Sequence, residues 1–424
     1  MSDISPTRFA ALRDDIDTTC FAPQHGVVNR VGAEVEFLVL DELTRLPLPL
    51  GGPRGLVERL RRYATRAGWT EFRGYDGTPR FDAAGLATIS FEPGGQLEIS
   101  TIPCGSASEL IRLLHRVVNP VQTALAHEGV VLFAAGIDPQ NDVGRIPLQL
   151  HVDRYERMTR YFEAIGPFGA RMMRQTAAIQ ISLDRGERPA ERWRLLNDLA
   201  PYLIAVFANS PHYHGAETGH RSFRAKCWRM LDSTRTGVAV FDDDPAGAYT
   251  RFALAANDML AVDDGGVRRP FSTSLTGADD ASRWATHLTT LFPEVRPRGH
   301  FEVRSCDAID PVHYAAPIVF LTGLTYDRRS AAEAALLAAE SRALLRVAGE
   351  RGLGDVVIAR TARDLFALAI AGARRLGPKF IDERDVDVAA QFYTDYTARE
   401  RSPADDRTLP LAASAIKAVA RSSD

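Results

Sequence analysis

Two glutamates stand two residues apart in a segment whose apolar residues alternate like those of a β-strand. Residues 31–41 read VGAEVEFLVLD, in which Glu34 and Glu36 alternate with Val35 and Phe37. Successive side chains of a strand point to opposite faces, so the carboxylates share one face and the apolar side chains the other. Neighbouring carboxylates repel each other unless a cation neutralises them, and hard cations such as Mg²⁺ prefer oxygen ligands. The pair therefore suits a cation site, although amphipathic edge strands also produce this pattern by chance.

A second acidic pair flanks a tight turn. Residues 91–100 read FEPGGQLEIS and place Glu92, Gln96 and Glu98 around a Pro-Gly-Gly breaker. Side chains alternate along both strands of such a hairpin, so these three polar groups share one face. A half-solvated amphipathic hairpin explains this segment equally well when it is taken alone. Two acidic pairs on separate strands favour a divalent-cation site more than one pair does.

A third strand-like segment joins an acid to a base. In RGHFEVRSCDAID, over residues 298–310, Glu302 and Arg304 are again two residues apart and share one face. A structural ion pair is the default interpretation. The alternative is a metal ligand beside a phosphate clamp, because the planar guanidinium fork of arginine suits phosphate oxygens.

Polar groups suited to ligand binding occur in two further segments. Residues 208–237 leave a helix through a loop containing Pro and Gly, and carry Arg221 and Arg224. Loops on a rigid scaffold commonly hold substrate-binding groups. In MMRQTAAIQISLD, Thr176 and Gln180 alternate with apolar residues. That polar face suits ligand contact, and a solvated face fits the pattern as well.

Several common catalytic templates are absent from the sequence. There is no G-x-x-x-x-G-K-[ST] loop, no G-x-G-x-x-G after a strand and no G-x-S-x-G elbow. If a nucleotide is bound, metal ions and arginines must therefore hold its phosphates.

Composition and charge narrow the class of protein. The 424 residues carry a net charge of −3, which gives no global field toward nucleic acid or an anionic membrane. No run approaches the roughly 20 apolar residues that a membrane helix needs, and no secretory signal is visible. The four cysteines form no C-x-x-C pair, so reduced thiols are expected. These features predict a cytoplasmic protein with neither nucleic acid nor membrane as partner, while its oligomeric state stays open.

The pattern of apolar residues predicts an α+β architecture. Strands are expected over 31–40, 88–92, 96–100, 130–135, 175–183 and 300–304, and helices over 54–67, 106–127 and 190–208. Residues 328–400 are almost wholly helical in pattern, and a short helix is expected to close the chain. We therefore expect an α+β catalytic core over 1–325 and a helical C-terminal part over 326–424, packed on the core and not independent.

Taken together and in order, these blocks resemble a known enzyme family. GAEVEF, FEPGGQLEIS, MMRQTAAIQISLD, the loop TGHRSFRAKCW and FPEVRPRGHFEVRSCD are similar to segments of glutamate–cysteine ligases of the plant and proteobacterial type. They also resemble the actinobacterial ligases that open ergothioneine synthesis. The resemblance runs from about Gly32 to Asp307 and continues less distinctly beyond. It implies a glutamine-synthetase-like fold, in which a curved, mainly antiparallel sheet forms a funnel surrounded by helices.

The resemblance also implies a reaction and roles for the residues named above. ATP, L-glutamate and L-cysteine would give γ-glutamylcysteine, ADP and phosphate through a γ-glutamyl phosphate, with Mg²⁺ or Mn²⁺ as the metal. It implies metal ligands at Glu34, Glu36, Glu92, Glu98 and Glu302. Arg304 would contact the transferring phosphate, with Glu92 as the second catalytic group. The substrate-binding residues would be Arg224, Arg221, Gln96, Thr176 and Gln180.

Two departures from the family pattern keep alternatives open. Ser305 and Cys306 stand where plant-type members resemble LEMRGADGG, and STIPCG follows the hairpin where an SGAP-like stretch is usual. The second departure bears on the choice of amine. A ligase that activates glutamate for a different amine is one alternative, and a catalytically silent binding protein of the same fold is another. The sequence leaves open whether the product enters glutathione or ergothioneine biosynthesis.

Overall fold

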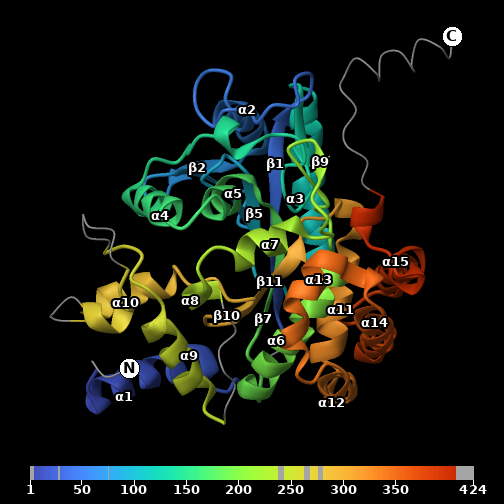
Figure 1. Ribbon diagram of the computed structural model, residues 1–424. Helices are drawn as coiled ribbons and strands as arrows, with labels where there is room; N and C mark the ends of the chain where they lie inside the picture. The colour runs from blue at the N-terminus through green and yellow to red at the C-terminus, as the bar shows by residue number, and fades with distance from the viewer. Residues whose placement is uncertain are drawn as a thin grey trace.

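A single antiparallel sheet forms the centre of the molecule (Figure 1). The computed structural model describes residues 4–26, 29–74, 76–236, 243–261, 268–275 and 280–406. Within them the nine-stranded sheet has the order β10–β11–β7–β1–β5–β4–β3–β2, and β6 pairs with the second half of β1. The strands are β1 Val31–Asp41, β2 Thr70–Arg73, β3 Pro79–Asp82, β4 Ala87–Phe91, β5 Leu97–Thr101, β6 Val130–Phe133, β7 Ala178–Leu183, β10 Val295–Pro297 and β11 Phe301–Asp307. A separate hairpin joins β8 His212–Tyr213 to β9 Ala216–Glu217.

The two faces of the sheet differ sharply in character. Glu34 lies opposite Gln180 on β7 and Ser100 on β5, while Glu36 lies opposite Glu98. Because side chains alternate along each strand, these polar residues occupy one face. The other face is apolar and belongs to the main hydrophobic core, with Val35, Ile99, Ile89, Ile181 and Val303 among its buried residues.

Helices cover both faces of the sheet. The described helices are α1 Pro6–Ile16, α2 Leu56–Ala67, α3 Ala107–Ala126, α4 Asp153–Glu163, α5 Phe168–Gln175, α6 Pro189–Val206, α7 Phe223–Arg229, α8 Ser233–Thr236, α9 Pro245–Ala255, α10 Asp280–Leu288, α11 Ala315–Thr325, α12 Arg328–Leu337, α13 Leu345–Arg351, α14 Val356–Leu376 and α15 Glu383–Asp395. Helices α3 and α6 pack on the apolar face, α3 against β1, β5 and β6, and α6 against β10 and β11. Helices α4, α5 and α7 lie over the polar face, where their side chains complete the site described below.

The C-terminal helices pack together beside the sheet (Figure 1). Helix α11 crosses α14 so closely that a Cβ on Gly323 would lie 2.1 Å from the carbonyl oxygen of Ala369. The main hydrophobic cluster runs from Ile16 to Phe392 and includes residues of the sheet and of these helices. The predicted division near residue 325 falls between α11 and α12 and stays a prediction.

The predicted fold class is confirmed, and most predicted elements are present. Some boundaries differ: the strand predicted over 130–135 ends at Phe133, and the one predicted over 300–304 runs on to Asp307. The strand predicted from residue 175 begins at Ala178, because Gln175 is the last residue of α5. There the Gln175 amide donates to the carbonyl of Asn141 at 2.7 Å, which ties the end of the helix to a neighbouring loop. A short closing helix after residue 406 was also predicted, and it lies outside the described residues.

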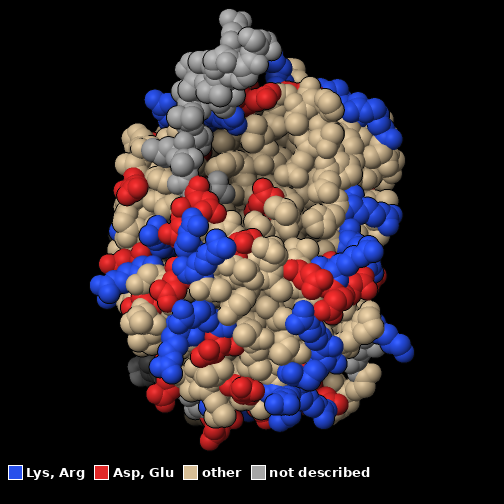
Figure 2. Space-filling view, turned by 90° about the vertical axis from the view of Figure 1, so that its right-hand side faces the viewer, with Lys and Arg blue, Asp and Glu red and all other residues tan. Residues whose placement is uncertain are grey.

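Three further features concern the molecule as a whole. Among the described residues, no helix combines the length and apolar character needed to cross a bilayer. All four cysteines are buried and free. On the face turned toward the viewer in Figure 2, basic and acidic side chains are interspersed, in keeping with the small net charge of the chain.

Candidate active site

A polar cavity opens over the charged face of the sheet. Its volume is about 250 Å³, and its walls come from the strands below and from α4, α5, α7 and the segment 289–298 above. The residues that line it are Glu34, Glu36, Glu92, Pro93, Gln96, Glu98, Arg154, Tyr155, Met158, Met172, Met173, Thr176, Gln180, Arg224, Trp228, Thr289, Phe292, Arg296, Arg298 and Arg304. Carboxylates gather on the hairpin side of this cavity, and arginines come from α4, α7, β10, β11 and the turn between β10 and β11.

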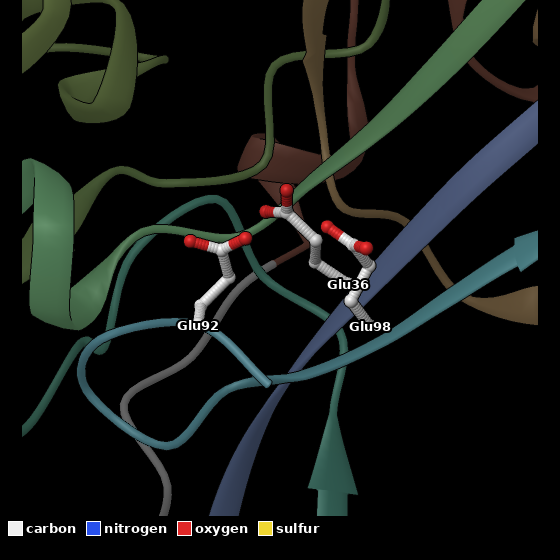
Figure 3. Close-up of side chains that lie close together, drawn as sticks. All are labelled: Glu36, Glu92 and Glu98. Carbon is white, nitrogen blue, oxygen red and sulfur yellow. The ribbon is translucent and has the colours of Figure 1, made fainter. Parts of the chain in front are cut away.

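Three carboxylates meet on the hairpin side of the cavity. Glu36 projects from β1, Glu98 stands opposite it on β5, and Glu92 comes from the turn that joins β4 to β5. One oxygen from each lies within 4.8 Å of the others, and Figure 3 shows the three side chains pointing into a shared space. The alternation of β1 and the tight turn of the hairpin therefore bring together the groups that the sequence placed on one face.

Hydrogen bonds orient two of these carboxylates. Glu36 accepts from the backbone N–H of Ala178 and from the Gln180 amide, both at 2.8 Å. Glu98 accepts from the hydroxyls of Ser90 at 2.7 Å and Ser100 at 3.0 Å. The donors stand on β7, β4 and β5 of the same sheet, so the sheet itself sets where the carboxylate oxygens lie.

The carboxylate cluster lacks enough positive charge in the protein to balance it. Burial, reinforced by the charge of Glu98, raises the pKa of Glu34 to about 8 and that of Glu36 to about 7. The same two causes raise the pKa of Glu92 well above its usual range. Buried like charges of this kind are stable as anions only with a cation beside them. An all-oxygen donor set suits Mg²⁺ or Mn²⁺, so the residues present fit such an ion.

Glu302 has a different environment on the same face. Its carboxylate accepts from Arg296 at 2.8 and 3.1 Å and from Arg304, and Arg298 lies at 3.5 Å. Burial alone would raise the pKa of this carboxyl, but Arg296 and Arg304 outweigh it and hold the pKa below its usual range. Glu302 is fully buried and does not line the cavity. The structure thus gives it arginine partners, where the sequence suggested a metal ligand.

The arginines around Glu302 direct positive charge into the cavity. Between Val303 and Cys306 the register of β11 against β7 shifts, and a bulge of this kind re-aims side chains. The Arg304 guanidinium lies 5.1 Å from the ring centre of Trp228. Its buried Nε atom has no hydrogen-bond partner among the described residues. This donor is therefore available to an anion in the cavity.

Arg224 lies against the same tryptophan, 5.3 Å from its ring centre and about one turn before it in helix α7. Its side chain is 5% exposed, its Nη2 donates to the carbonyl of Arg304 at 2.9 Å, and its Nη1 lies 3.8 Å from Asp307. Trp228 anchors this arrangement by donating to the carbonyl of Phe292 at 2.8 Å. Arg221 points elsewhere: its side chain is 45% exposed and pairs with Asp405 at 3.1 Å. The structure brings Arg224 into the cavity and leaves Arg221 outside it.

The remaining predicted polar residues line the cavity, but they use their polar atoms differently. Gln96 donates to the carbonyl of Thr176 at 2.9 Å and accepts from the N–H of Gly94 at 3.0 Å. Thr176 donates to the carbonyl of Met172 at 2.7 Å. Gln180 binds Glu36 through its nitrogen, and its buried Oε1 has no partner among the described residues. Of these three side chains, Gln180 retains a free acceptor for a ligand.

Residues 30–374 match a family described as Glutamate-cysteine ligase family 2 (GCS2), which is more than half of the chain. The chain belongs to this family. The resemblance predicted from the sequence is therefore confirmed.

Relatives of this family from bacteria and plants are similar over much of the chain. Glutamate–cysteine ligase EgtA of Mycolicibacterium smegmatis is 31% identical over 423 residues, covering 94% of this chain and 91% of the relative. The EgtA protein of Mycobacterium tuberculosis is 34% identical over 350 residues, 76% of each chain. Chloroplastic glutamate–cysteine ligase A of Oryza sativa subsp. japonica is 29% identical over 265 residues, 58% of this chain and 53% of the relative.

A solved structure supports the fold. The glutamate–cysteine ligase of Francisella tularensis, solved in complex with AMP, superposes with a TM-score of 0.54 and 14% identity. The match covers 90% of this chain and 84% of that one. At this identity the likeness concerns the fold, and it agrees with the predicted glutamine-synthetase-like sheet.

Sequence reasoning missed most of the residues that line the cavity from the helices above the sheet. Helix α4 contributes Arg154, Tyr155 and Met158, which stand in a segment without a recognisable motif, and α5 contributes Met173, an apolar residue at the start of the MMRQTAAIQISLD block. Arg296 and Arg298 could have been found from the sequence. They stand two residues apart just before FEVR, as Glu302 and Arg304 do within it. That spacing on the neighbouring strand β10 places Arg296 directly opposite Glu302.

Proposed function

We propose that this protein joins the γ-carboxylate of L-glutamate to the amine of L-cysteine, with ATP converted to ADP and phosphate. One observation carries the proposal: in a member of this family, a cluster of carboxylates and a group of arginines line the same cavity. Carboxylate ligands for a divalent cation and arginines for phosphate oxygens are what phosphoryl transfer from a nucleotide requires.

The reaction proceeds in two displacements without a protein nucleophile. The glutamate γ-carboxylate attacks the γ-phosphorus of ATP, the bond to the β-phosphate oxygen breaks, and ADP leaves. The cysteine amine then attacks the carbonyl carbon of γ-glutamyl phosphate, phosphate leaves, and the amine loses a proton. The catalytic contribution of the protein is positioning and electrostatic stabilisation of the transferring group.

We assign the metal-binding role to Glu36, Glu92 and Glu98, with Glu34 beside them. When bound there, Mg²⁺ or Mn²⁺ supplies positive charge that neutralises the phosphate oxygens of ATP. Glu302 takes a different role in this proposal: it holds Arg296 and Arg304 in position from below. Glu302 is fully buried beneath these arginines and does not line the cavity, which supports that choice.

The remaining roles follow from the free polar atoms of the cavity. Arg304 donates to the transferring phosphate through its unpartnered Nε. Arg224 binds the α-carboxylate of glutamate, since its guanidinium is buried, lines the cavity and has only a weak ion pair behind it. Gln180 accepts from a substrate ammonium through Oε1. Gln96 and Thr176 shape the wall, because their side chains are committed to backbone partners.

Measurement of ADP release tests this assignment and separates it from its alternatives. The protein is supplied with ATP, Mg²⁺ and glutamate, with and without cysteine, and the products are weighed by mass spectrometry. Cysteine-dependent release with formation of γ-glutamylcysteine is the expected result. ADP release that depends on glutamate but not on cysteine would support a ligase that uses another amine. No release from folded protein that binds nucleotide would support the silent binding protein.

A further inference from the structure

The turn that carries Glu92 is buried. Pro93, Gly94 and Gly95 all lie in the interior, whereas most turns run over the surface and leave their backbone groups to water. Each buried N–H and C=O group of this turn must therefore find a partner within the protein.

Two glutamines supply several of these partners, Gln96 through its side chain and Gln149 through both its backbone and its side chain. Gln96, within the hairpin, accepts from the N–H of Gly94 at 3.0 Å. Gln149 approaches from a distant loop: its backbone N–H donates to the carbonyl of Pro93 and its amide to that of Gly94, both at 2.7 Å. The carbonyls of Pro93 and Gly94 are thus both bound by one residue.

The fit around the turn leaves no room for movement. A Cβ on Gly95 would lie 2.4 Å from the amide nitrogen of Gln149, and Gly95 has a φ of +89° that favours glycine. On the other side, a Cβ on Gly94 would lie 2.1 Å from the carbonyl oxygen of Arg174. The Gln149 amide therefore occupies the space that glycine leaves open, and the end of α5 closes the opposite side.

Gln149 also connects the turn to the strand that carries Glu36. Its Oε1 accepts from the N–H of Leu50, and residues 47–50 run beside β1 through a bond from the N–H of Leu48 to the carbonyl of Val39 at 2.9 Å. The Gln149 amide thus joins the hairpin turn to residues 47–50, which lie beside β1. This link sets the separation between the elements that carry Glu92 and Glu36.

We propose that Gln149 is a positioning residue that fixes Glu92 relative to Glu36 and Glu98, and so sets the affinity of these carboxylates for a divalent cation. The inference rests on the cation site of the proposed function. Glu92 and its neighbours repel one another, so the turn must be held against that repulsion when no cation is bound. Gln149 does this from a distance, since it is bonded to the backbone of the turn and not to the carboxylates.

The test compares Gln149→Met with Gln391→Met. Methionine keeps the length of the side chain but removes the amide's donor bonds to the carbonyls of Gly94 and Leu48 and its acceptor bond from Leu50. Gln391 is an exposed residue of α15, so its variant controls for the chemical change alone. Mn²⁺ binding is measured by isothermal titration calorimetry on the full chain, without nucleotide or substrates.

We expect the affinity for Mn²⁺ to fall about tenfold in Gln149→Met, the usual scale for groups that orient metal ligands. Gln391→Met should bind like the wild type. In the activity assay, the Mg²⁺ concentration for half-maximal rate should rise in Gln149→Met, and excess Mg²⁺ should restore the rate. If Gln149 had only a structural role, Gln149→Met would have a lower thermal stability, and excess Mg²⁺ would not restore its rate.

Each other outcome has a defined meaning. Unchanged Mn²⁺ affinity in Gln149→Met, with binding intact in the wild type, would overturn the role of Gln149 alone. A wild type that binds no Mn²⁺ would contradict the cation site and the proposed function with it. If Gln149→Met does not fold, Gln149→Asn replaces it: the shorter amide cannot span from Leu50 to Gly94, and it should weaken Mn²⁺ binding in the same way.

Discussion

At the scale of single residues, the neighbours of a buried glutamate decide its chemistry. Glu302 and Glu36 lie on one face of one sheet, where Glu302 is buried and Glu36 is partly buried. Arginines hold the pKa of Glu302 below its usual range, whereas burial and a neighbouring acid raise that of Glu36 to about 7. The first is a completed ion pair, and the second is a group that requires a cation.

Glu92→Gln should abolish catalysis without unfolding the protein. Glutamine removes one cation ligand, and ligands of this kind supply several kcal/mol of transition-state stabilisation, so kcat should fall by about 100-fold or more. The free energy of unfolding without metal should stay equal or increase, because one of the mutually repelling carboxylates is gone. Steady-state ADP release and urea unfolding measure the two effects. Glu217→Gln, on the exposed strand β9, is the control.

Arg224→Ala should weaken glutamate binding while Arg221→Ala leaves it unchanged. A hydrogen-bonded charge is worth about 1.5–3 kcal/mol, so KM for glutamate should rise roughly 10- to 100-fold in the first variant. Arg221 lies in the same loop, but it is exposed and pairs with Asp405. Initial rates at varied glutamate decide the matter, and equal KM values in the two variants would remove Arg224 from the glutamate site.

Sequence reasoning reached those residues whose position depends on alternation along a strand. Glu34, Glu36 and Glu98 line the cavity because a strand projects every second side chain to one face. It left the role of Glu302 open between an ion pair and a metal ligand, since whether an acid meets a cation or an arginine depends on the partner strand. Here Arg296 of β10 is that partner, and strand pairing is a long-range property that a single segment does not contain.

At the scale of elements, the hairpin turn determines the geometry of the cavity. Gly94→Ala should disturb the turn, because its Cβ would lie 2.1 Å from the backbone oxygen of Arg174. We expect a loss of about 1–3 kcal/mol in the free energy of unfolding, the usual range for overpacking, together with weaker activation by Mg²⁺. Gly51→Ala is the matched control, since nothing lies within 4 Å of its added Cβ. Equal stability of both variants in urea would contradict the tight fit of the turn.

The packing of α10 against α9 should make stability depend on pH. His287 of α10 is buried, bonds to the carbonyl of Ala253 at 2.8 Å and stacks on Phe271 with ring centres 3.9 Å apart. Burial lowers its pKa to about 4, whereas in the unfolded chain the ordinary value is about 6.5. As pH falls below 6.5, the unfolded chain binds a proton that the folded protein does not, so stability is lost toward pH 4.

Between pH 7 and pH 5 this histidine should therefore cost about 2 kcal/mol in the free energy of unfolding. His287→Gln should reduce the difference between the two pH values by about that amount, as measured by urea unfolding at each pH. His151→Gln should leave the difference unchanged, because the side chain of His151 is 70% exposed. An identical pH dependence in all three proteins would refute the assignment to His287.

Sequence patterns predicted the strands and long helices of this fold, but not the short helices that cover the cavity. The strands and long helices were predicted because each carries a complete apolar face, as in α3, whose buried residues recur along one side. Helices α4 and α5 are short, and their packing against the cavity depends on tertiary contacts. No local pattern predicts such a covering wall, since its partner lies in a distant part of the sequence.

At the scale of the whole molecule, the C-terminal helices share one core with the sheet. Helix α11 belongs to the predicted catalytic part, and it packs on α14 and α15 of the predicted C-terminal part. Gly323 and Gly372 allow this close crossing, because a Cβ on either would lie within 2.3 Å of a backbone oxygen of the other helix. The two parts are therefore expected to unfold together.

The four tryptophans provide the means to test this expectation. Trp69, Trp193, Trp228 and Trp284 all precede residue 326, so their fluorescence reports on the predicted catalytic part. Circular dichroism at the helical wavelength also reports on α12 to α15. In a cooperative molecule, the two signals change at the same urea concentration. Gly323→Ala should lower both midpoints equally, through a loss of about 1–3 kcal/mol in the free energy of unfolding, because it separates helices that the core joins. A loss of helix before any change in fluorescence would instead mean that residues 326–406 form a unit of their own, and the division near residue 325 would then be a true domain boundary.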